Sequence, residues 1–122
     1  MKILVADDEE AVRDSLAIML KKNSQNEIDF AVDGEEAVTK ITSANYDLLL
    51  LDIEMPKING YEVLKKVRAL YPTLPVVFIT ARGEPSKVRK SIAQYRLNGY
   101  LEKPFDTIAV LDIVKKALGL PG

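Results

Sequence analysis

The sequence contains neither cysteine nor histidine. Without cysteine the chain has no disulfide, thiolate metal site or thiol nucleophile, a composition typical of reducing compartments. Without histidine it has no Ser-His-Asp catalysis and no histidine metal site, so any phosphohistidine that reacts with it must belong to a partner. Lys and Arg total 17 against 18 Asp and Glu. This balance excludes a general attraction to nucleic acid or to an anionic membrane.

Long apolar runs are also missing. None approaches the roughly 18 residues of a membrane-spanning helix, and acids follow the first strand-like run too early for a signal peptide. We therefore expect a cytoplasmic protein without a membrane partner. The 122 residues are 48% hydrophobic and 29% charged, which predicts one packed domain. We expect that domain over residues 1–119, with 120–122 as a tail or the start of a removed linker.

Short apolar runs alternate with longer amphipathic segments, a pattern that predicts strands each followed by a helix. Strands are predicted at 3–6, 28–32, 47–51, 76–80 and 100–101, and helices at 9–22, 35–42, 61–70, 87–95 and 107–118. The leucine run 48–51 predicts a strand covered on both faces. The inward helix positions are predicted to be Val12, Leu16, Met19, Leu20, Val63, Leu64, Val67, Val88, Ile92, Tyr95, Leu111, Val114 and Leu118.

This alternation predicts an α/β fold with a parallel sheet between two helical layers. Right-handed crossovers leave few topologies open. We expect the flavodoxin-like, doubly wound order 2-1-3-4-5 with five helices, whose switch point lies between strands one and three.

Polar residues fall where the predicted strands end. They are Asp7 and Asp8 after the first strand, Asp52 after the third, Thr80 after the fourth and Lys103 after the fifth. In an open parallel sheet these ends face one crevice. Three carboxylates there repel one another unless a cation joins them, and an oxygen-only donor set suits Mg²⁺. Lys103 could bind phosphate and Thr80 could donate a hydroxyl, so the group predicts in-line phosphoryl transfer onto Asp52.

Each of these residues also has a purely structural interpretation. Asp7 and Asp8 precede a helix and could cap it or interact with its dipole. Asp52 could cap a loop, Thr80 could be a turn hydroxyl and Lys103 a solvated cation. The combination favours the chemical interpretation, because separate strand ends supply complementary groups to one crevice.

The wider pattern resembles the signature of response-regulator receiver domains. It comprises Asp7-Asp8, Asp52 with Met55-Pro56 and Gly60, Thr80-Ala81, and Tyr100-Leu101-x-Lys103-Pro104-Phe105, and the resemblance runs from Lys2 to about Leu118. It implies that Asp52 is the phosphoacceptor. It also implies that Asp8, Asp52 and the backbone carbonyl of Glu54 bind Mg²⁺, with Asp7 helping through water.

The resemblance further implies that Lys103 pairs with the phosphoryl oxygens and that the Lys103-Pro104 bond is cis. Thr80 and Tyr100 match the coupled switch pair of the family, in which the hydroxyl moves onto the phosphoryl group and the ring turns inward. The signalling surface would be the fourth helix, fifth strand and fifth helix. Such a domain catalyses only its own phosphorylation and dephosphorylation.

Partners follow from the same resemblance. The phosphodonor would be a histidine kinase or phosphotransfer protein, and the recipient of the signal a downstream output domain or protein. A phosphorylation-dependent homodimer is compatible with it, and direct nucleic acid binding by this domain is not expected. A stand-alone receiver and the receiver of a longer regulator both remain open.

Two other functions fit parts of the pattern. A haloacid-dehalogenase-like phosphatase also forms an aspartyl phosphate, and Asp52-x-Glu54 resembles its paired acids, but that family places its nucleophile on the first strand. A pseudo-receiver binding module keeps the fold without phosphorylation, and such modules typically lack an acid or the lysine that this chain retains.

Two features depart from the usual receiver pattern, and a third, the charge around the fourth helix, bears on partner binding. Arg96-Leu97 stands where members usually have Gly-Ala, so we expect an altered loop there. Glu54 and Arg82 flank the acceptor with long charged side chains, and are expected to hinder the water that hydrolyses the phosphoryl group. Cations outnumber acids around the fourth helix: Arg82, Lys87, Arg89, Lys90 and Arg96 against Glu84. This run is either a solvated face or part of the signalling surface.

Overall fold

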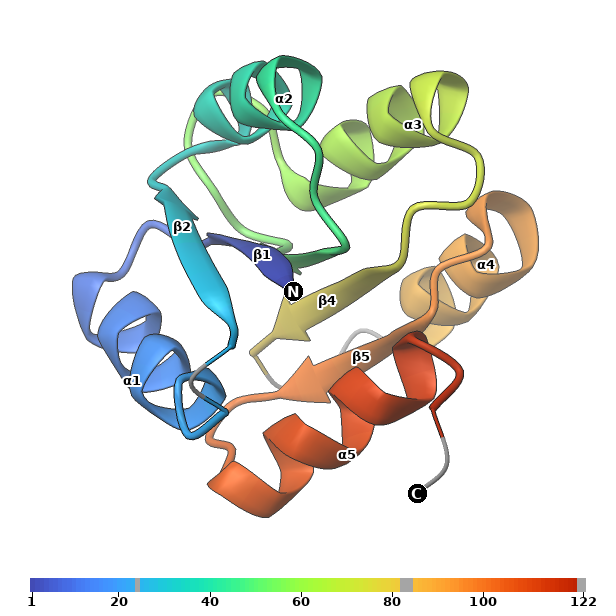
Figure 1. Cartoon of the computed structure of the whole chain (residues 1–122). Helices are drawn as coiled ribbons and strands as arrows, with labels where there is room; N and C mark the ends of the chain where they lie inside the picture. The colour runs from blue at the N-terminus through green and yellow to red at the C-terminus, as the bar shows by residue number, and fades with distance from the viewer. Residues whose placement is uncertain (24, 82–84, 121–122) are drawn as a thin grey trace.

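A computed structural model describes residues 1–23, 25–81 and 85–120 (Figure 1). The described residues form β1 (Lys2–Ala6), α1 (Glu10–Leu20), β2 (Glu27–Ala31), α2 (Gly34–Ser43), β3 (Leu48–Asp52), α3 (Gly60–Leu70), β4 (Val76–Thr80), α4 (Pro85–Tyr95), β5 (Gly99–Glu102) and α5 (Thr107–Ala117). The predicted alternation of strands and helices is therefore confirmed. α4 begins earlier than predicted, at a proline, because proline has no N–H to leave unpaired in the first turn of a helix.

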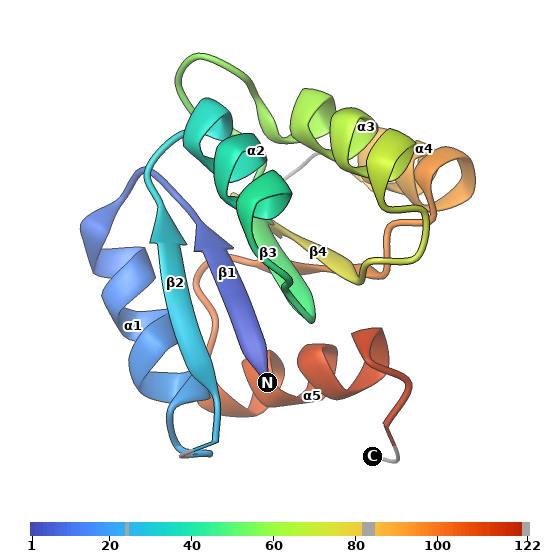
Figure 2. The same ribbon diagram turned by 45° about the horizontal axis from the view of Figure 1, so that its top comes forward.

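The strands form one parallel sheet in the order β2-β1-β3-β4-β5. The predicted flavodoxin-like order is confirmed. Helices α2, α3 and α4 cover one face of the sheet, and α1 and α5 cover the other (Figures 1 and 2). The connection from β1 to β2 carries α1 on one face of the sheet, and the connection from β2 to β3 carries α2 on the other. The strand order therefore reverses at β1, and the switch point lies between β1 and β3.

The leucine run forms the centre of the core. Leu48 to Leu51 are all 0% exposed. Leu49 and Leu51 pack under α2, α3 and α4, while Leu48 and Leu50 pack under α1 and α5. Burial of each side chain contributes on the order of 2 kcal/mol. The prediction of a strand covered on both faces is confirmed, and Asp52 ends this strand.

Two predicted inward positions are wrong. Ile92 on α4 is 42% exposed, and Leu111 on α5 is only half-buried. α5 instead buries Val110, Val114 and Ala117. On α4 Val88 is buried as predicted, but the second buried position is Ser91, whose hydroxyl donates to the Lys87 carbonyl at 3.0 Å. In both helices a smaller side chain is buried in place of the larger neighbour, Ser91 in place of Ile92 and Val110 in place of Leu111, and hydrophobicity alone does not encode that preference.

The loop from α4 to β5 starts at Arg96, the residue that replaces the usual glycine. Arg96 has φ +51°, in the left-handed region, where a Cβ costs about 1–2 kcal/mol. Its carbonyl accepts a hydrogen bond of 3.1 Å from Arg68. Burial, and then the charge of Arg96, lower the pKa of Arg68. The following Leu97 is buried in the core. The loop therefore keeps the left-handed backbone conformation that favours glycine, although Arg96 occupies the position.

We expect Arg96→Gly to raise the free energy of unfolding by about 0.5–1 kcal/mol, because it removes the Cβ from a left-handed position at some cost in chain entropy. Urea unfolding followed by circular dichroism measures the change. Arg96→Ala is the matched control, since it removes the charge and keeps the Cβ. Equal stability of the two variants would show that the charge beside Arg68, and not the backbone, is the source of the effect.

Candidate functional site

The carboxyl ends of the central strands bring the predicted acids together. Asp7 follows β1 and is 0% exposed, Asp52 is the last residue of β3 and 4% exposed, and Asp8 lies at the surface. One carboxylate oxygen from each lies within 4.8 Å of the others. The prediction that these three side chains share one crevice is confirmed by the geometry.

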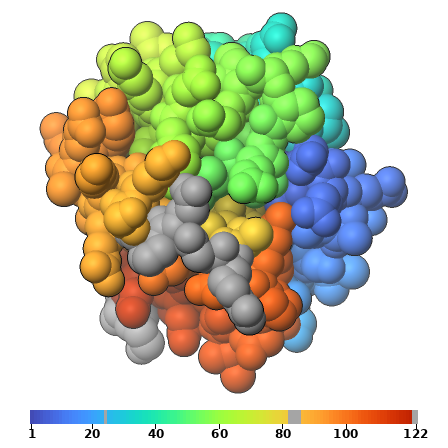
Figure 3. Space-filling model, turned by 180° about the vertical axis from the view of Figure 1, so that it is seen from behind, coloured from blue at the N-terminus to red at the C-terminus, as the bar shows by residue number. Residues whose placement is uncertain are grey.

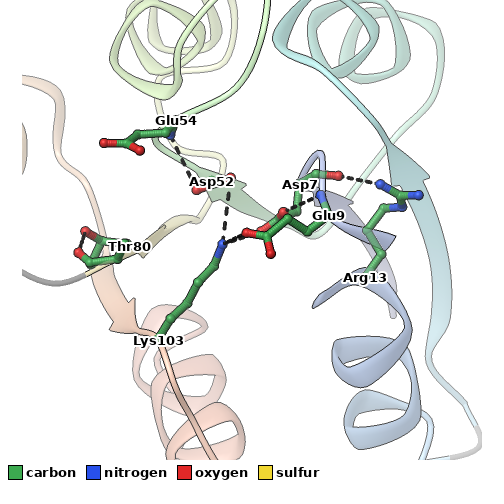
Figure 4. A network of polar contacts seen from close by, with 8 residues as sticks. Asp7, Glu9, Arg13, Asp52, Glu54, Thr80 and Lys103 are labelled. Carbon is green, nitrogen blue, oxygen red and sulfur yellow. Dashed lines mark hydrogen bonds and ion pairs between the residues drawn. The ribbon is translucent and has the colours of Figure 1, made fainter. Parts of the chain in front are cut away.

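Lys103 connects this acidic cluster to β5. Its Nζ lies 3.2 Å from Asp7 Oδ2 and 3.9 Å from Asp52 Oδ2 (Figure 4). The nearest carboxylate is Glu9, whose Oε1 is 3.1 Å from Nζ. The Lys103-Pro104 bond is cis, as the resemblance implied. The Lys103 ammonium therefore lies within ion-pair distance of Asp52, the predicted acceptor, and it also pairs with Asp7 and Glu9.

Burial, with a smaller contribution from neighbouring carboxylates, raises the pKa of two of these acids, Asp7 and Asp52. Burial, and then the charge of Asp7, raise the pKa of Asp52 to about 7, although Lys103 opposes the shift. Burial likewise raises the pKa of Asp7. For Lys103, burial disfavours the ammonium, but Glu9, Asp52 and Asp7 outweigh it and raise the pKa. A site that penalises its own carboxylates gains from any added positive charge.

The residues present fit a divalent cation. Asp7 Oδ2 is buried and, although Lys103 lies close to it, accepts no hydrogen bond from the described residues. The three acids offer only oxygen donors, which is the ligand set that Mg²⁺ prefers. A buried carboxylate oxygen that has an ion pair but no hydrogen bond, beside two further carboxylates, is the pattern that a bound cation relieves.

A cavity opens above Asp52. It is lined by Asp8, Glu9, Asp52, Ile53, Glu54, Thr80, Ala81 and Lys103. Seen from behind, the end of β4 lies in a hollow between the segment after β3, the start of α1 and the segment after β5 (Figure 3). The Glu54 N–H donates to Asp52 Oδ1 at 3.4 Å. The Thr80 hydroxyl donates to the Ala81 carbonyl at 2.6 Å, so it bonds to the backbone and not to Asp52.

Tyr100 lies apart from the cavity. Its side chain is 46% exposed, and it lines a groove between β5 and α5. Lys87, Arg89 and Lys90 of the basic run are exposed on α4, and Lys87 Nζ is 5.7 Å from the Tyr61 ring centroid. The expected effect of Glu54 and Arg82 on the hydrolytic water also depends on Arg82, which lies outside the described residues, as does Glu84. The Glu54 carboxylate points away from Asp52 (Figure 4).

Sequence reasoning missed the roles of Glu9 and Arg13. The Glu9 N–H donates to Asp7 Oδ1 at 2.9 Å, and its carboxylate bonds to Lys103. Arg13 Nη1 donates to the Asp7 backbone carbonyl at 2.8 Å. Both residues were predicted only as parts of a helix. Glu9 is the N-cap residue of α1 and Arg13 lies in its first turn. Their closeness in sequence to Asp7-Asp8 was the one available signal.

Fold and site together define a doubly wound α/β domain with an acidic, lysine-containing cluster at its switch point. The model of the response regulator receiver domain matches residues 3–115. The chain is 39% identical over 117 residues to the transcriptional regulatory protein ResD of Bacillus subtilis, covering 96% of this chain and 48% of ResD. It is 40% identical over 105 residues to the response regulator MprA of Mycobacterium avium, covering 86% of this chain and 45% of MprA.

Solved structures agree. The chemotaxis response regulator CheY4 of Vibrio cholerae superimposes with a TM-score of 0.86 at 30% identity, covering 96% of this chain and 98% of CheY4. The chain belongs to the response regulator receiver domain family. It is accordingly a phosphorylation-activated switch domain of two-component signalling, with a regulatory role and not a metabolic one. The phosphatase alternative is not favoured.

The chain spans about half the length of the curated relatives it matches. Among the described residues, no helix is both long and apolar enough to cross a membrane.

Proposed function

We propose that Asp52 accepts a phosphoryl group from a phosphohistidine on a histidine kinase or phosphotransfer partner. One observation supports this assignment above the others. Asp52 is the carboxylate that is nearly buried, borders the cavity and touches both the acidic cluster and Lys103. A carboxylate at the base of an open cavity can be reached by a phosphorus atom, while its charged neighbours surround the transferred group.

The reaction balances with the partner's imidazole as leaving group. A carboxylate oxygen of Asp52 forms a bond to phosphorus as the P–N bond breaks, and the bonding electron pair stays with the imidazole nitrogen, which takes up a proton. Lys103 would follow the developing charge onto the phosphoryl oxygens. Mg²⁺, held by Asp8, Asp52 and the Glu54 backbone carbonyl with Asp7 acting through water, would neutralise the carboxylates and the phosphoryl oxygens.

The switch would run from Thr80 to Tyr100. We propose that the Thr80 hydroxyl leaves the Ala81 carbonyl for the phosphoryl group, and that the exposed Tyr100 ring turns inward. This would reshape the face made by α4, β5 and α5, where an output domain or protein, or a second copy of the chain, would bind. We place the receiver at residues 1–119, with 120–122 as a tail or linker start, and its site of action in the cytoplasm.

The direct test is phosphorylation in solution. Incubation with Mg²⁺ and acetyl phosphate should increase the intact mass by one phosphoryl group, hydroxylamine should remove it, and EDTA should prevent it. No mass gain under any condition would indicate a pseudo-receiver. Continuous release of phosphate at many turnovers without modified protein would instead support a phosphatase.

A further inference from the structure

The turn from β2 into α2 packs against the loop that follows the acceptor strand. This turn, here called the support corner, consists of Asp33 and Gly34. The loop, here called the acceptor loop, runs from residue 53 to 59 and begins directly after Asp52. The two segments lie side by side at the carboxyl edge of the sheet (Figures 1 and 2).

Gly34 makes the closest contact between the two segments. A Cβ built on Gly34 would lie 1.9 Å from the Ile58 carbonyl oxygen and 2.8 Å from its carbonyl carbon. Both atoms belong to the backbone, so a side-chain rotation cannot relieve the overlap. Glycine is required here because of space, and any larger residue must push the acceptor loop away from α2.

Asp33 makes the second contact. Its Oδ1 accepts a hydrogen bond of 2.8 Å from the Glu36 N–H and caps α2. Its Oδ2 lies 3.4 Å from Lys57 Nζ in the middle of the acceptor loop. Lys57 has φ +71°, a left-handed conformation that is costly for a residue with a Cβ. The ion pair thus ties a strained loop residue to a fixed helix terminus.

Both ends of the acceptor loop are fixed by the acceptor strand. The Gly60 N–H donates to the Ile53 carbonyl at 2.7 Å, and a Cβ on Gly60 would lie 2.6 Å from the Asp52 carbonyl oxygen. Met55 is buried in the core. Near the start of the acceptor loop, the Glu54 N–H donates a hydrogen bond to Asp52 Oδ1. A displacement at Lys57 or Ile58 therefore shifts a short, closed segment that carries Glu54.

We propose that the support corner positions the cation site, although neither residue borders the cavity. Gly34 and the Asp33–Lys57 ion pair hold the acceptor loop so that the Glu54 backbone stays beside Asp52. This inference rests on the proposed function for the role of Glu54 as a ligand. Asp33, Gly34 and Lys57 are positioning residues and not ligands, and they should set the affinity for Mg²⁺ from a distance, as supporting residues of metal sites do.

Calorimetric titration of the unphosphorylated protein with MgCl2 tests the proposal. Gly34→Ala should weaken Mg²⁺ affinity about tenfold, by analogy with the loss of outer partners at metal sites. Thr39→Gly is the matched control: Thr39 is an exposed residue of the same helix, so the substitution destabilises α2 and should keep wild-type affinity once both variants are shown by circular dichroism to be folded. Equal weakening in both variants would overturn the proposal, because general destabilisation would then explain the loss.

The ion pair gives a test that does not introduce a clash. If Asp33 and Lys57 acted only through their charges, Asp33→Asn would weaken Mg²⁺ binding and Lys57→Gln would strengthen it. If they position the loop, Asp33→Asn and Lys57→Gln should both weaken Mg²⁺ binding, each about twofold. Lys57→Arg keeps the positive charge and should bind Mg²⁺ with wild-type affinity. Asparagine still caps α2, so Asp33→Asn keeps the helix start. Stronger binding by Lys57→Gln would overturn the proposal.

Asp8→Ala separates this inference from the proposed function. It removes a proposed direct ligand and should eliminate the calorimetric signal. Wild-type affinity in Asp8→Ala would refute the proposed site itself. Lost binding in Asp8→Ala together with wild-type affinity in every support-corner variant would refute the support corner alone.

Discussion

Asp52→Asn should eliminate the gain of a phosphoryl group, the largest functional effect that we expect from a single substitution. The amide has nearly the shape of the carboxylate but is a poor nucleophile and a poor ligand for a hard cation. Asp52 is almost fully buried beside the core. Because asparagine has nearly the same shape, the substitution should nevertheless leave the fold intact. Intact mass after incubation with Mg²⁺ and acetyl phosphate provides the measurement.

Asp14→Asn is the control for this experiment, because Asp14 is an exposed acid on α1. It should be phosphorylated to the wild-type level. If Asp52→Asn were modified as fully as the wild type, the phosphoryl group would have to be on another side chain. Peptide mapping of the reduced acyl phosphate would then locate it.

The same substitution should make the metal-free protein more stable at neutral and alkaline pH. The pKa of Asp52 is raised from 3.8 to about 7 by burial and by the charge of Asp7. A carboxyl with a raised pKa in the folded state contributes stability below its unfolded value, and that contribution is lost as pH rises through the folded value. Stability in EDTA should therefore fall between about pH 4 and pH 7. Above that window, Asp52→Asn should gain about 2–4 kcal/mol over the wild type.

Urea unfolding across this pH range, with EDTA and with Mg²⁺, measures the effect. Mg²⁺ should stabilise the wild type by binding the folded state and should restore little stability to Asp52→Asn. The difference between the two proteins should shrink below about pH 4, where the wild-type carboxyl is protonated in both states. A pH-independent difference would show that packing, and not the buried charge, separates the two proteins.

The sequence was sufficient to predict the sheet and most of the site, because both follow from short-range patterns and general topology. The leucine run and the polar strand ends locate Asp52 at the switch point without any side-chain coordinates. The alternating pattern did not predict that Ser91, and not Ile92, faces the core. Nor did it predict the contact of Glu9 with Lys103. Those features depend on helix rotation and on neighbours distant in sequence, which periodicity does not record.

The support corner was invisible for the same reason. Asp33-Gly34 falls between the predicted strand 28–32 and the predicted helix 35–42, and nothing in the sequence relates it to Ile58. The left-handed conformation of Arg96 was equally hidden, because an arginine gives no local signal of a positive φ. The contact of Gly34 with Ile58 and the conformation of Arg96 both depend on the tertiary structure, which the local sequence does not record.

The position of β3 between β1 and β4 affects how such a domain can diversify. The proposed acceptor ends a strand whose backbone is bonded on both sides and whose leucines are covered on both faces. Substitutions there disturb every layer at once, whereas β5 is an edge strand and α4 exposes most of its side chains. Mutational drift can therefore remodel the peripheral face, which is the proposed partner surface, while the residues around Asp52 stay unchanged. One chemistry can in this way be inherited by many pathways that do not cross-react.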